Sequence, residues 1–248
     1  MSKFSLALFA ASSLVLATPA LADSASIPSS VMDWSGPTVG AEYASGWGRE
    51  NDNFTEVTGY PGTFGSLESS DHYHLTGNLA GLNAGFNQQY GVWVVGVAAD
   101  IALGDISGKS QATFNTGEGT GFSSLSLRNT WQSTFRVRGG YAFEKALIYA
   151  EGGVAIGDAR LSYTVDDPTT FDSTLSGSQT KTLVGWTAGA GVQYALTSHW
   201  SIGAEGRYLD LGKASYNIPA ELSLSGTQTS YKAGFTESEA LFLLQYRF

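Results

Sequence analysis

The chain ends in Leu241-Phe-Leu-Leu-Gln-Tyr-Arg-Phe248, the stretch that decides the fold. Its residues alternate with a period of two, which is the side-chain period of a β-strand. One face carries Ala240, Phe242, Leu244, Tyr246 and Phe248, and the other carries Glu239, Gln245 and Arg247 together with Leu241 and Leu243. A strand with one apolar face, one partly charged face and aromatic residues near its end fits a β-barrel whose outside contacts lipid and whose inside is polar.

Seven more segments repeat this alternation of two unlike faces. In each, apolar and aromatic residues occupy one parity, and glycine, polar or charged residues occupy the other. In the fifth segment the apolar parity switches between Ile156 and Leu161. We expect a β-bulge there, near Gly157 and Asp158, because one inserted residue turns every later side chain to the other face. The eight predicted strands are residues 39–47, 81–90, 93–101, 135–143, 148–165, 184–194, 200–208 and 239–248.

The links between these segments alternate between short and long. Three links have the length of tight hairpin turns: residues 90–92, 144–146 and 197–199. Four links are long and polar: residues 49–77, 105–130, 166–181 and 213–234. This predicts an all-β fold, an eight-stranded antiparallel up-and-down transmembrane β-barrel with short periplasmic turns and four long extracellular loops. A soluble β-sandwich would also alternate, but it would not gather small and charged residues on one face opposite Trp and Tyr at the strand ends.

The first 22 residues have the three regions of a secretory signal peptide. Lys3 is the single charge, an apolar segment covers residues 4–16, and Ala20 and Ala22 form a small-x-small cleavage site. The apolar segment is too short to serve instead as a membrane-spanning anchor. We expect a signal peptide at residues 1–22, an N-terminal periplasmic segment at residues 23–33 and an outer-membrane barrel at residues 34–248, in a Gram-negative bacterium.

The composition narrows the class of protein further. The chain has no cysteine, so disulfides and thiolate metal sites are excluded. It has 22 acidic residues against 13 Lys and Arg. This acidic balance argues against a nucleic-acid partner and predicts no polybasic patch for anionic lipid head groups. Outside the predicted signal peptide, the longest apolar run, residues 92–99, is far shorter than a membrane helix.

If the apolar faces contact lipid, the inward face of the barrel carries five acidic and four basic residues. The bore of an eight-stranded barrel is only wide enough for side chains to fill it, and an unpaired buried charge is costly. We therefore expect a lumen charge network that fills the bore; a selectivity filter or gated pore is the alternative. The nine residues are Glu42, Asp100, Arg136, Arg138, Glu151, Glu205, Arg207, Glu239 and Arg247.

Several stretches resemble the small outer-membrane β-barrel proteins of alphaproteobacteria, called porin-family or outer membrane immunogenic proteins. They are GVWVVGVAAD (residues 91–100), TFRVRGGYAF (134–143), YAEGGVAIG (149–157), GWTAGAGVQYALTSHWSIGAEGRYLDLG (185–212) and the terminal YRF (246–248). The resemblance implies an eight-stranded outer-membrane barrel with an envelope-integrity or surface-antigen role. It also implies insertion by the barrel-assembly machinery, which would read the C-terminal assembly signal Phe242, Leu244, Tyr246 and Phe248.

The chain departs from this family at two places. Pro37 and Thr38 stand where the family usually has an aromatic pair, so the first strand is expected to begin later. Ala98 stands where an acidic residue is common, which changes the expected charge pattern of the lumen.

Other motifs give no site for chemistry. Asp71, His72 and His74 could ligate a metal, but a third firm ligand is missing, and His199 is expected on the opposite rim. A lipid-modifying enzyme needs a nucleophile, a base and an orienting group within reach of one another, and no Ser-containing motif accompanies these histidines. Residues 104–110 are one residue short of a phosphate-binding loop, and no helix follows. We predict no catalytic residue, no metal and no cofactor.

Three functions compete for a barrel of this kind. The first is a structural barrel, not an enzyme, that supports the envelope and presents surface loops for antigen-like or adhesion-like contacts. The second is a small porin-like diffusion channel, and the third is an outer-membrane lipid-modifying enzyme. The charges in the narrow bore favour the first. Expected partners are outer-membrane lipids, lipopolysaccharide and, during insertion, the barrel-assembly machinery, with no nucleic acid.

Overall fold

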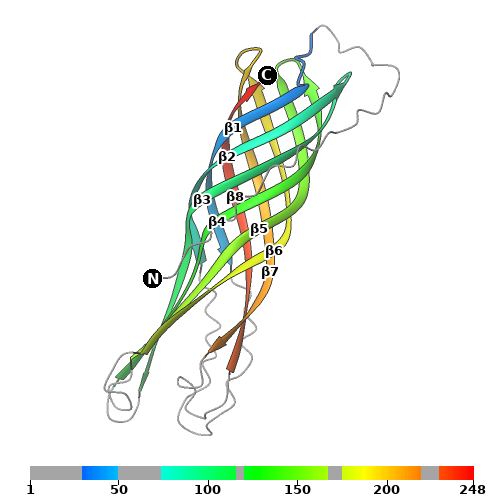
Figure 1. The fold of residues 1–248 in the computed structure, drawn as a ribbon. Coiled ribbons are helices and arrows are strands. Elements are labelled where there is room, and N and C mark those ends of the chain that lie inside the picture. The colour runs from blue at the N-terminus through cyan, green and yellow to red at the C-terminus, as the bar shows by residue number, and fades with distance from the viewer. Residues whose placement is uncertain (1–29, 50–73, 116–119, 167–174, 219–228) are drawn as a thin grey trace, which may run out of the picture.

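The computed structural model describes residues 30–49, 74–115, 120–166, 175–218 and 229–248. They form eight antiparallel strands that close into a barrel in sequence order, so that β8 pairs with β1 (Figure 1). This confirms the predicted fold class. No helix in the described residues is long and apolar enough to cross a membrane. The strands are β1 (Gly36–Arg49), β2 (His74–Tyr90), β3 (Trp93–Asn115), β4 (Thr120–Phe143), β5 (Ala146–Asp166), β6 (Leu175–Ala195), β7 (Trp200–Ile218) and β8 (Thr229–Arg247).

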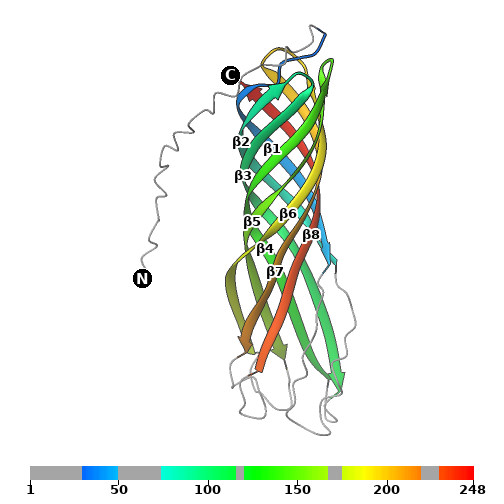
Figure 2. The ribbon, with the colours of Figure 1, turned by 90° about the vertical axis from the view of Figure 1, so that its right-hand side faces the viewer.

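The short turns lie at one end of the barrel, together with the C-terminus (Figures 1 and 2). Residues 91–92 link β2 to β3, and residues 144–145 link β4 to β5. Gly91 and Glu144 have positive φ angles of 62° and 48°, which is typical of two-residue hairpin turns between twisted strands. Residues 196–199 link β6 to β7 at the same end. In the predicted topology this is the periplasmic end, and the opposite end is the extracellular end.

Pairing between β1 and β8 closes the barrel. Their register runs from Thr38 opposite Arg247 to Arg49 opposite Thr236. The backbone N–H of Phe248 adds a hydrogen bond of 3.1 Å to the carbonyl of Pro37. The expected later start of the first strand is therefore wrong: β1 begins at Gly36, because Pro37 offers its carbonyl to the ladder and lies at the strand start, where its missing N–H is tolerated.

The strands extend far beyond the predicted boundaries at the extracellular end, where they form long hairpin stems (Figure 2). Residues 105–130, predicted as a loop, are mostly strand: β3 and β4 pair from Ser107 opposite Arg128 to Asn115 opposite Thr120. The other predicted loops are shortened in the same way by β2, β6, β7 and β8. Polar Ser, Thr and Gly residues in these stems concealed the strands, since no lipid-facing apolar parity marks them.

The predicted irregularity near Asp158 exists, but the extra residue is in β4 and not in β5. Arg128 pairs with Arg160 and Gln132 with Gly157, so four steps along β4 match three steps along β5. The carboxylate of Asp158 closes this bulge, because it accepts hydrogen bonds from the backbone N–H of Thr130 (2.7 Å) and Trp131 (3.0 Å) and from the hydroxyl of Thr130 (2.8 Å).

The apolar residues of β5 change face because the interior of the barrel changes character. Ala155, Ala159 and Leu161 all point inward and are buried, so β5 itself keeps its parity. The middle of the interior is polar and charged, and its periplasmic end holds a small apolar cluster with Val94, Ala142 and Leu147. The extracellular half is filled by apolar side chains. We call this apolar set the apolar layer; its large members are Leu75, Leu79, Ile106, Leu127, Leu161, Leu183, Leu209, Leu211, Phe235 and Leu241.

Large apolar side chains cover the outside of the barrel over its polar interior. Leu82 is 67% exposed and Val184 is 64% exposed. Exposing such large apolar side chains to water would be costly, but the same surface suits contact with lipid acyl chains. Aromatic residues mark the periplasmic edge of this band, where Trp93 contacts Tyr141 and Trp200 contacts Tyr246 edge to face. The band gives the barrel its position in the membrane.

Replacing Asp158 with Ala should open the β4 bulge and destabilise the barrel. Three hydrogen bonds to a buried carboxylate are lost and two backbone donors are left unpaired, so the free energy of unfolding should fall by about 1–3 kcal/mol. Urea unfolding of the refolded protein, followed by tryptophan fluorescence, measures the change. The control is Asp105→Ala, which removes only an exposed ion pair and should cost less than about 1 kcal/mol. Equal effects of the two substitutions would contradict this role of Asp158.

Candidate functional site

Three arginines on the inward faces of β4 and β7 organise the middle of the lumen. The inward positions of a strand recur every second residue, so Arg136 and Arg138 both point into the bore from β4. Arg136 binds three carboxylates: its Nη2 lies 2.6 Å from Asp100 Oδ2, and its Nη1 lies 2.6 Å from Glu151 Oε1 and 3.2 Å from Glu205 Oε1. It is 2% exposed, so this guanidinium joins β3, β5 and β7 across the interior.

Arg207 of β7 connects the same group to the other side of the barrel. Its Nε donates to Glu205 Oε1 at 3.0 Å. Its Nη1 lies 3.6 Å from Asp100, 3.6 Å from Glu239 and 3.9 Å from Glu42. Because Arg136 and Arg207 share Asp100 and Glu205, they form one continuous network and not separate pairs.

Arg138 holds the periplasmic side of this network. Its Nε and Nη2 donate to Glu151 Oε2 at 3.0 and 2.8 Å. The guanidinium also lies 4.0 Å from the ring centre of Tyr149, a cation–π contact. The Tyr149 hydroxyl donates to Glu205 Oε2 at 2.8 Å. Tyr149 therefore shields the charges from the periplasmic mouth and ties Arg138 to the carboxylate of β7.

Neutral polar side chains also donate hydrogen bonds to the carboxylates. Gln132 donates to Glu239, and the Thr134 hydroxyl donates to Asp100 Oδ2 at 2.5 Å. A chain of amides then leads toward the periplasmic mouth. In this chain, Gln193 donates to Gln245 and Gln245 donates to Asn83, both at 2.8 Å, and Asn83 donates to Glu42 at 3.3 Å. Each member is buried, so the polar network continues across the periplasmic half of the bore.

Inward-facing glycines give these long side chains their space. A Cβ placed on Gly40 would lie 2.8 Å from Gln245 Cγ and 2.9 Å from Asn83 Oδ1, closer than real Cβ contacts allow. A Cβ on Gly46 would lie 2.3 Å from Glu237 Oε1. The alternation of glycine with charge along each inward face is therefore a steric requirement of a bore this narrow.

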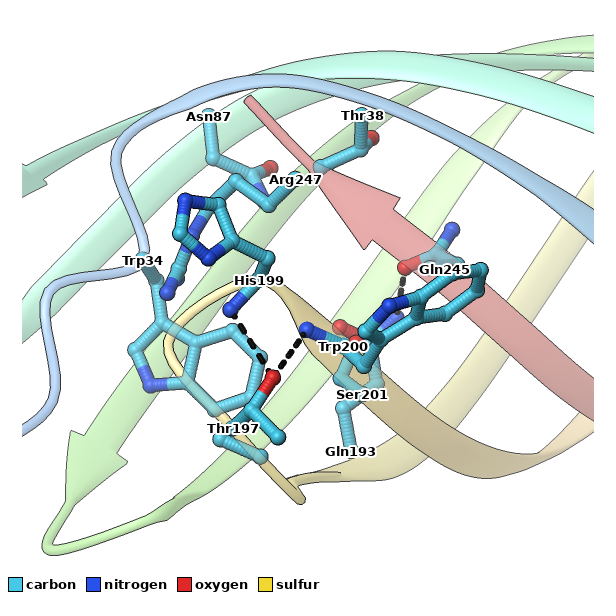
Figure 3. A pocket seen from close by; sticks show the side chains of 11 residues that line it. Trp34, Thr38, Asn87, Gln193, Thr197, His199, Trp200, Ser201, Gln245 and Arg247 are labelled. Atoms are coloured by element: carbon cyan, nitrogen blue, oxygen red, sulfur yellow. Dashed lines mark hydrogen bonds between the residues drawn. The ribbon is translucent and has the colours of Figure 1, made fainter.

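The structure brings eight of the nine predicted lumen residues together and leaves one apart. Arg247 lies at the periplasmic rim, where its Nη2 donates to the carbonyl of Ser198 at 2.6 Å and its guanidinium lies 5.5 Å from the ring centre of Trp34. Its assignment to the lumen network is wrong. Arg247 is the last residue of β8, and an inward side chain at the end of a strand lies at the mouth of the barrel and not within the bore. The side chain contributes to a small rim pocket (Figure 3).

The rim pocket has too little space for a ligand. It is lined by Trp34, His199, Trp200 and Arg247 among others (Figure 3), and its free volume is about 10 Å³, about that of one water molecule. The backbone N–H groups of His199 and Trp200 both donate to the Thr197 hydroxyl, at 3.2 and 3.0 Å. These contacts order the β6–β7 turn, so the pocket is part of a structured mouth.

The sequence-based assignment also missed one charged residue of the lumen. Glu237 is 1% exposed and lies two residues from Glu239 on the inward face of β8. The predicted strand began at Glu239, so the same parity extended by two residues would have found it. With Glu237, the described lumen holds six acidic residues and three arginines, and its geometry provides filling and cross-bracing.

The remaining predicted sites have the following positions. Ala20, Ala22, Asp71 and His72 lie outside the described residues, and His74 is the exposed first residue of β2. In the described part of the chain, no group of three His, Asp or Glu side chains could hold a metal ion. The C-terminal residues Phe242, Leu244 and Phe248 point to the lipid side, and the Tyr246 ring packs edge to face on Phe248 at 5.1 Å.

Replacing Arg136 with Gln should strongly destabilise the barrel. The substitution leaves Asp100, Glu151 and Glu205 without their shared partner, and removing one member of a buried ionic cluster costs about 3–5 kcal/mol. Urea unfolding of the refolded protein in vesicles measures the loss. Arg128→Gln is the matched control, because it removes a half-exposed arginine from the same strand and should cost less than about 1 kcal/mol. If the two variants unfold at the same urea concentration, the network does not brace the barrel.

Comparisons with known proteins agree with this architecture. The sequence matches the family described as "Outer membrane protein beta-barrel domain" over residues 8–237. It is 30% identical over 198 residues to a 31 kDa outer-membrane immunogenic protein of Brucella melitensis, covering 75% of each chain. A 22 kDa outer membrane protein of Rhizobium leguminosarum is 26% identical over 177 residues, which are 71% of this chain and 73% of that protein.

Among solved structures, Neisserial surface protein A is similar, with a TM-score of 0.42 and 14% identity over 86% of this chain and 98% of that one. The ring of eight antiparallel strands, the family match and the relatives from Gram-negative bacteria agree with the predicted resemblance and location. This chain therefore belongs to the outer-membrane protein β-barrel family, within the group of alphaproteobacterial outer-membrane immunogenic proteins.

Proposed function

We propose that this protein is a structural barrel of the outer membrane that conducts no solute, supports the envelope and presents its extracellular end at the cell surface. The observation that carries the proposal is that side chains fill the lumen along its length. A charge network and the apolar layer lie one after the other, and a smaller apolar cluster with Val94, Ala142 and Leu147 lies at the periplasmic end. The first layer is the charge network in the membrane, where Arg136 and Arg207 connect carboxylates from four other strands.

The second layer is the apolar layer on the extracellular side. Leu209 and Phe235 are 0% and 1% exposed, and together with residues from β2 to β6 they close the bore above the charges. An ion entering from outside would first have to cross this dry layer, where it loses its hydration without any polar partner. It would then have to displace arginine side chains that are each bound to several carboxylates. The apolar layer and the charge network obstruct the bore one after the other, and this favours a closed barrel.

The excess of acidic residues supports a second candidate, a small diffusion channel. Six acidic side chains face three arginines in the described lumen, so an opened bore would attract cations and repel anions. The porin-like alternative therefore makes a definite prediction about selectivity. A closed structural barrel predicts no stable current of either sign.

An enzymatic role has less support. Ser198 Oγ and His199 Nδ1 lie 2.8 Å apart, but they are adjacent residues of an exposed turn. A catalytic serine also needs a group that orients its base, and no carboxylate is recorded at the His199 ring among the described residues. We propose that the protein is not an enzyme and that this contact orders the β6–β7 turn.

The refolded mature chain, residues 23–248, should be silent in planar lipid bilayers after its insertion has been verified. Arg207→Ala alone should stay silent because the apolar layer remains, and Leu209→Ala/Phe235→Ala should stay silent because the charges remain. Only the triple variant should give stable current steps, and these should be selective for cations in a salt gradient. Leu82→Ala, a lipid-facing change of the same kind, is the control. Stable cation-selective steps from the unmodified chain would overturn the proposal in favour of the channel.

A further inference from the structure

Beyond the lipid band, the outward faces of β3 to β6 carry a patch of basic and hydroxyl side chains. Their direction follows from the strand alternation: Ile106, Leu127 and Leu161 are buried inside the barrel, so the residues next to them point outward. Arg128 and Arg160 are accordingly exposed. These four strands are consecutive in the sequence, and their antiparallel pairing sets their polar residues side by side.

The strand register arranges the patch in two rows. The first row crosses the four strands as Ser107, Arg128, Arg160 and Thr180. The second row, one outward position further from the membrane, crosses them as Lys109, Ser126, Ser162 and Ser178. We call these eight residues the basic–hydroxyl patch. They comprise three cations and five hydroxyl groups, with no acidic residue among them.

The patch lies at the level of the lipid head groups. The last large apolar residues below it on these strands are Leu103, Trp131, Ile156 and Val184. Arg160 follows Ile156 by four residues, or about 13 Å along the strand at about 3.3 Å per residue, and strand tilt reduces its height further. A guanidinium at this height reaches the polar surface of the outer leaflet and not its hydrocarbon interior.

The two arginines face each other across adjacent strands, which is unfavourable without an anion. Side chains directly opposite on one face have Cβ atoms only about 5 Å apart, and like charges there destabilise a sheet. Asp105 compensates Arg128 through a contact of 2.8 Å. Arg160 donates to the Ser178 hydroxyl at 3.3 Å, and the described residues provide it with no carboxylate. The geometry leaves a cationic position that the rest of the patch does not neutralise.

We propose that the basic–hydroxyl patch binds the phosphorylated sugar head group of lipopolysaccharide in the surrounding outer leaflet. Arginine presents a planar fork that matches phosphate oxygens in bidentate geometry, and Lys109 adds a third positive charge above it. The row of serine and threonine hydroxyls can donate to and accept from sugar hydroxyls. The inference rests on the orientation in the proposed function, in which the end with the long hairpin stems faces the cell exterior.

This proposal differs from the expectation from composition that the chain has no polybasic patch for anionic lipid head groups. The chain is acidic overall, and its basic residues form no run in the sequence. The patch collects one basic residue from each of β3, β4 and β5, while six acidic residues are held inside the barrel. The net charge of the chain therefore does not describe the charge of this surface.

The test is the affinity of the folded protein in detergent micelles for rough-strain lipopolysaccharide, measured by surface plasmon resonance. Arg128→Gln/Arg160→Gln should weaken binding by at least about tenfold, since two charge-assisted hydrogen-bonding groups are lost. The matched control is Lys145→Gln/Arg247→Gln, which removes the same charge at the periplasmic end and should leave the affinity within about twofold. Dephosphorylated lipopolysaccharide should bind weakly, and with equal strength, to the unmodified chain and to the patch variant.

Three results would overturn the inference: equal affinity of the patch variant and the unmodified chain, equal loss in the periplasmic control, or no preference of the unmodified chain for lipopolysaccharide over phosphatidylglycerol. Circular dichroism and heat-dependent gel mobility verify folding first. If the double variant does not refold, the single variants Arg160→Gln and Lys109→Gln are each compared with the unmodified chain for their affinity for lipopolysaccharide. Bilayer conductance is independent of this measurement, so a conducting barrel that still binds through the patch would refute only the closed lumen.

Discussion

The structure depends on one constraint: in lipid, every backbone N–H and C=O group must find its partner within the protein. A sheet meets this requirement only if it has no edge, and pairing of β1 with β8 removes the edge. Closure in turn fixes the two environments that every strand must satisfy, acyl chains outside and a narrow bore inside. The alternation of large apolar and small or charged residues along each strand follows from these two environments.

Eight strands make the bore so narrow that its contents are decided by packing. Charged side chains in this space cannot keep their water, so binding by neighbouring side chains replaces it for most of them. Arg136 and Arg207 share Asp100 and Glu205, and the glycines beside them leave the space that these long side chains need. In the closed barrel that we propose, the same crowding that forces the charges to pair blocks the bore, so stability and closure have one physical origin.

The barrel also continues past the membrane, where the chemistry of its two faces is exchanged. Outside the lipid band the outward face is polar, and it carries Arg128, Arg160 and hydroxyl groups. The interior there has no reason to be polar and is filled by leucines and Phe235. This exchange explains why the long stems were predicted as loops. The alternation of lipid-facing apolar residues ends at the lipid boundary, although the strands continue.

The sequence by itself determined the fold class, the faces of the strands in the membrane and most charges of the lumen, because a period of two assigns each residue to a face once a strand is recognised. It did not determine which residues meet across strands, since long-range register depends on closure of the whole barrel and on the β4 bulge at Asp158. Tertiary structure alone placed Arg247 at the rim and set Arg160 beside Arg128 on the outer surface.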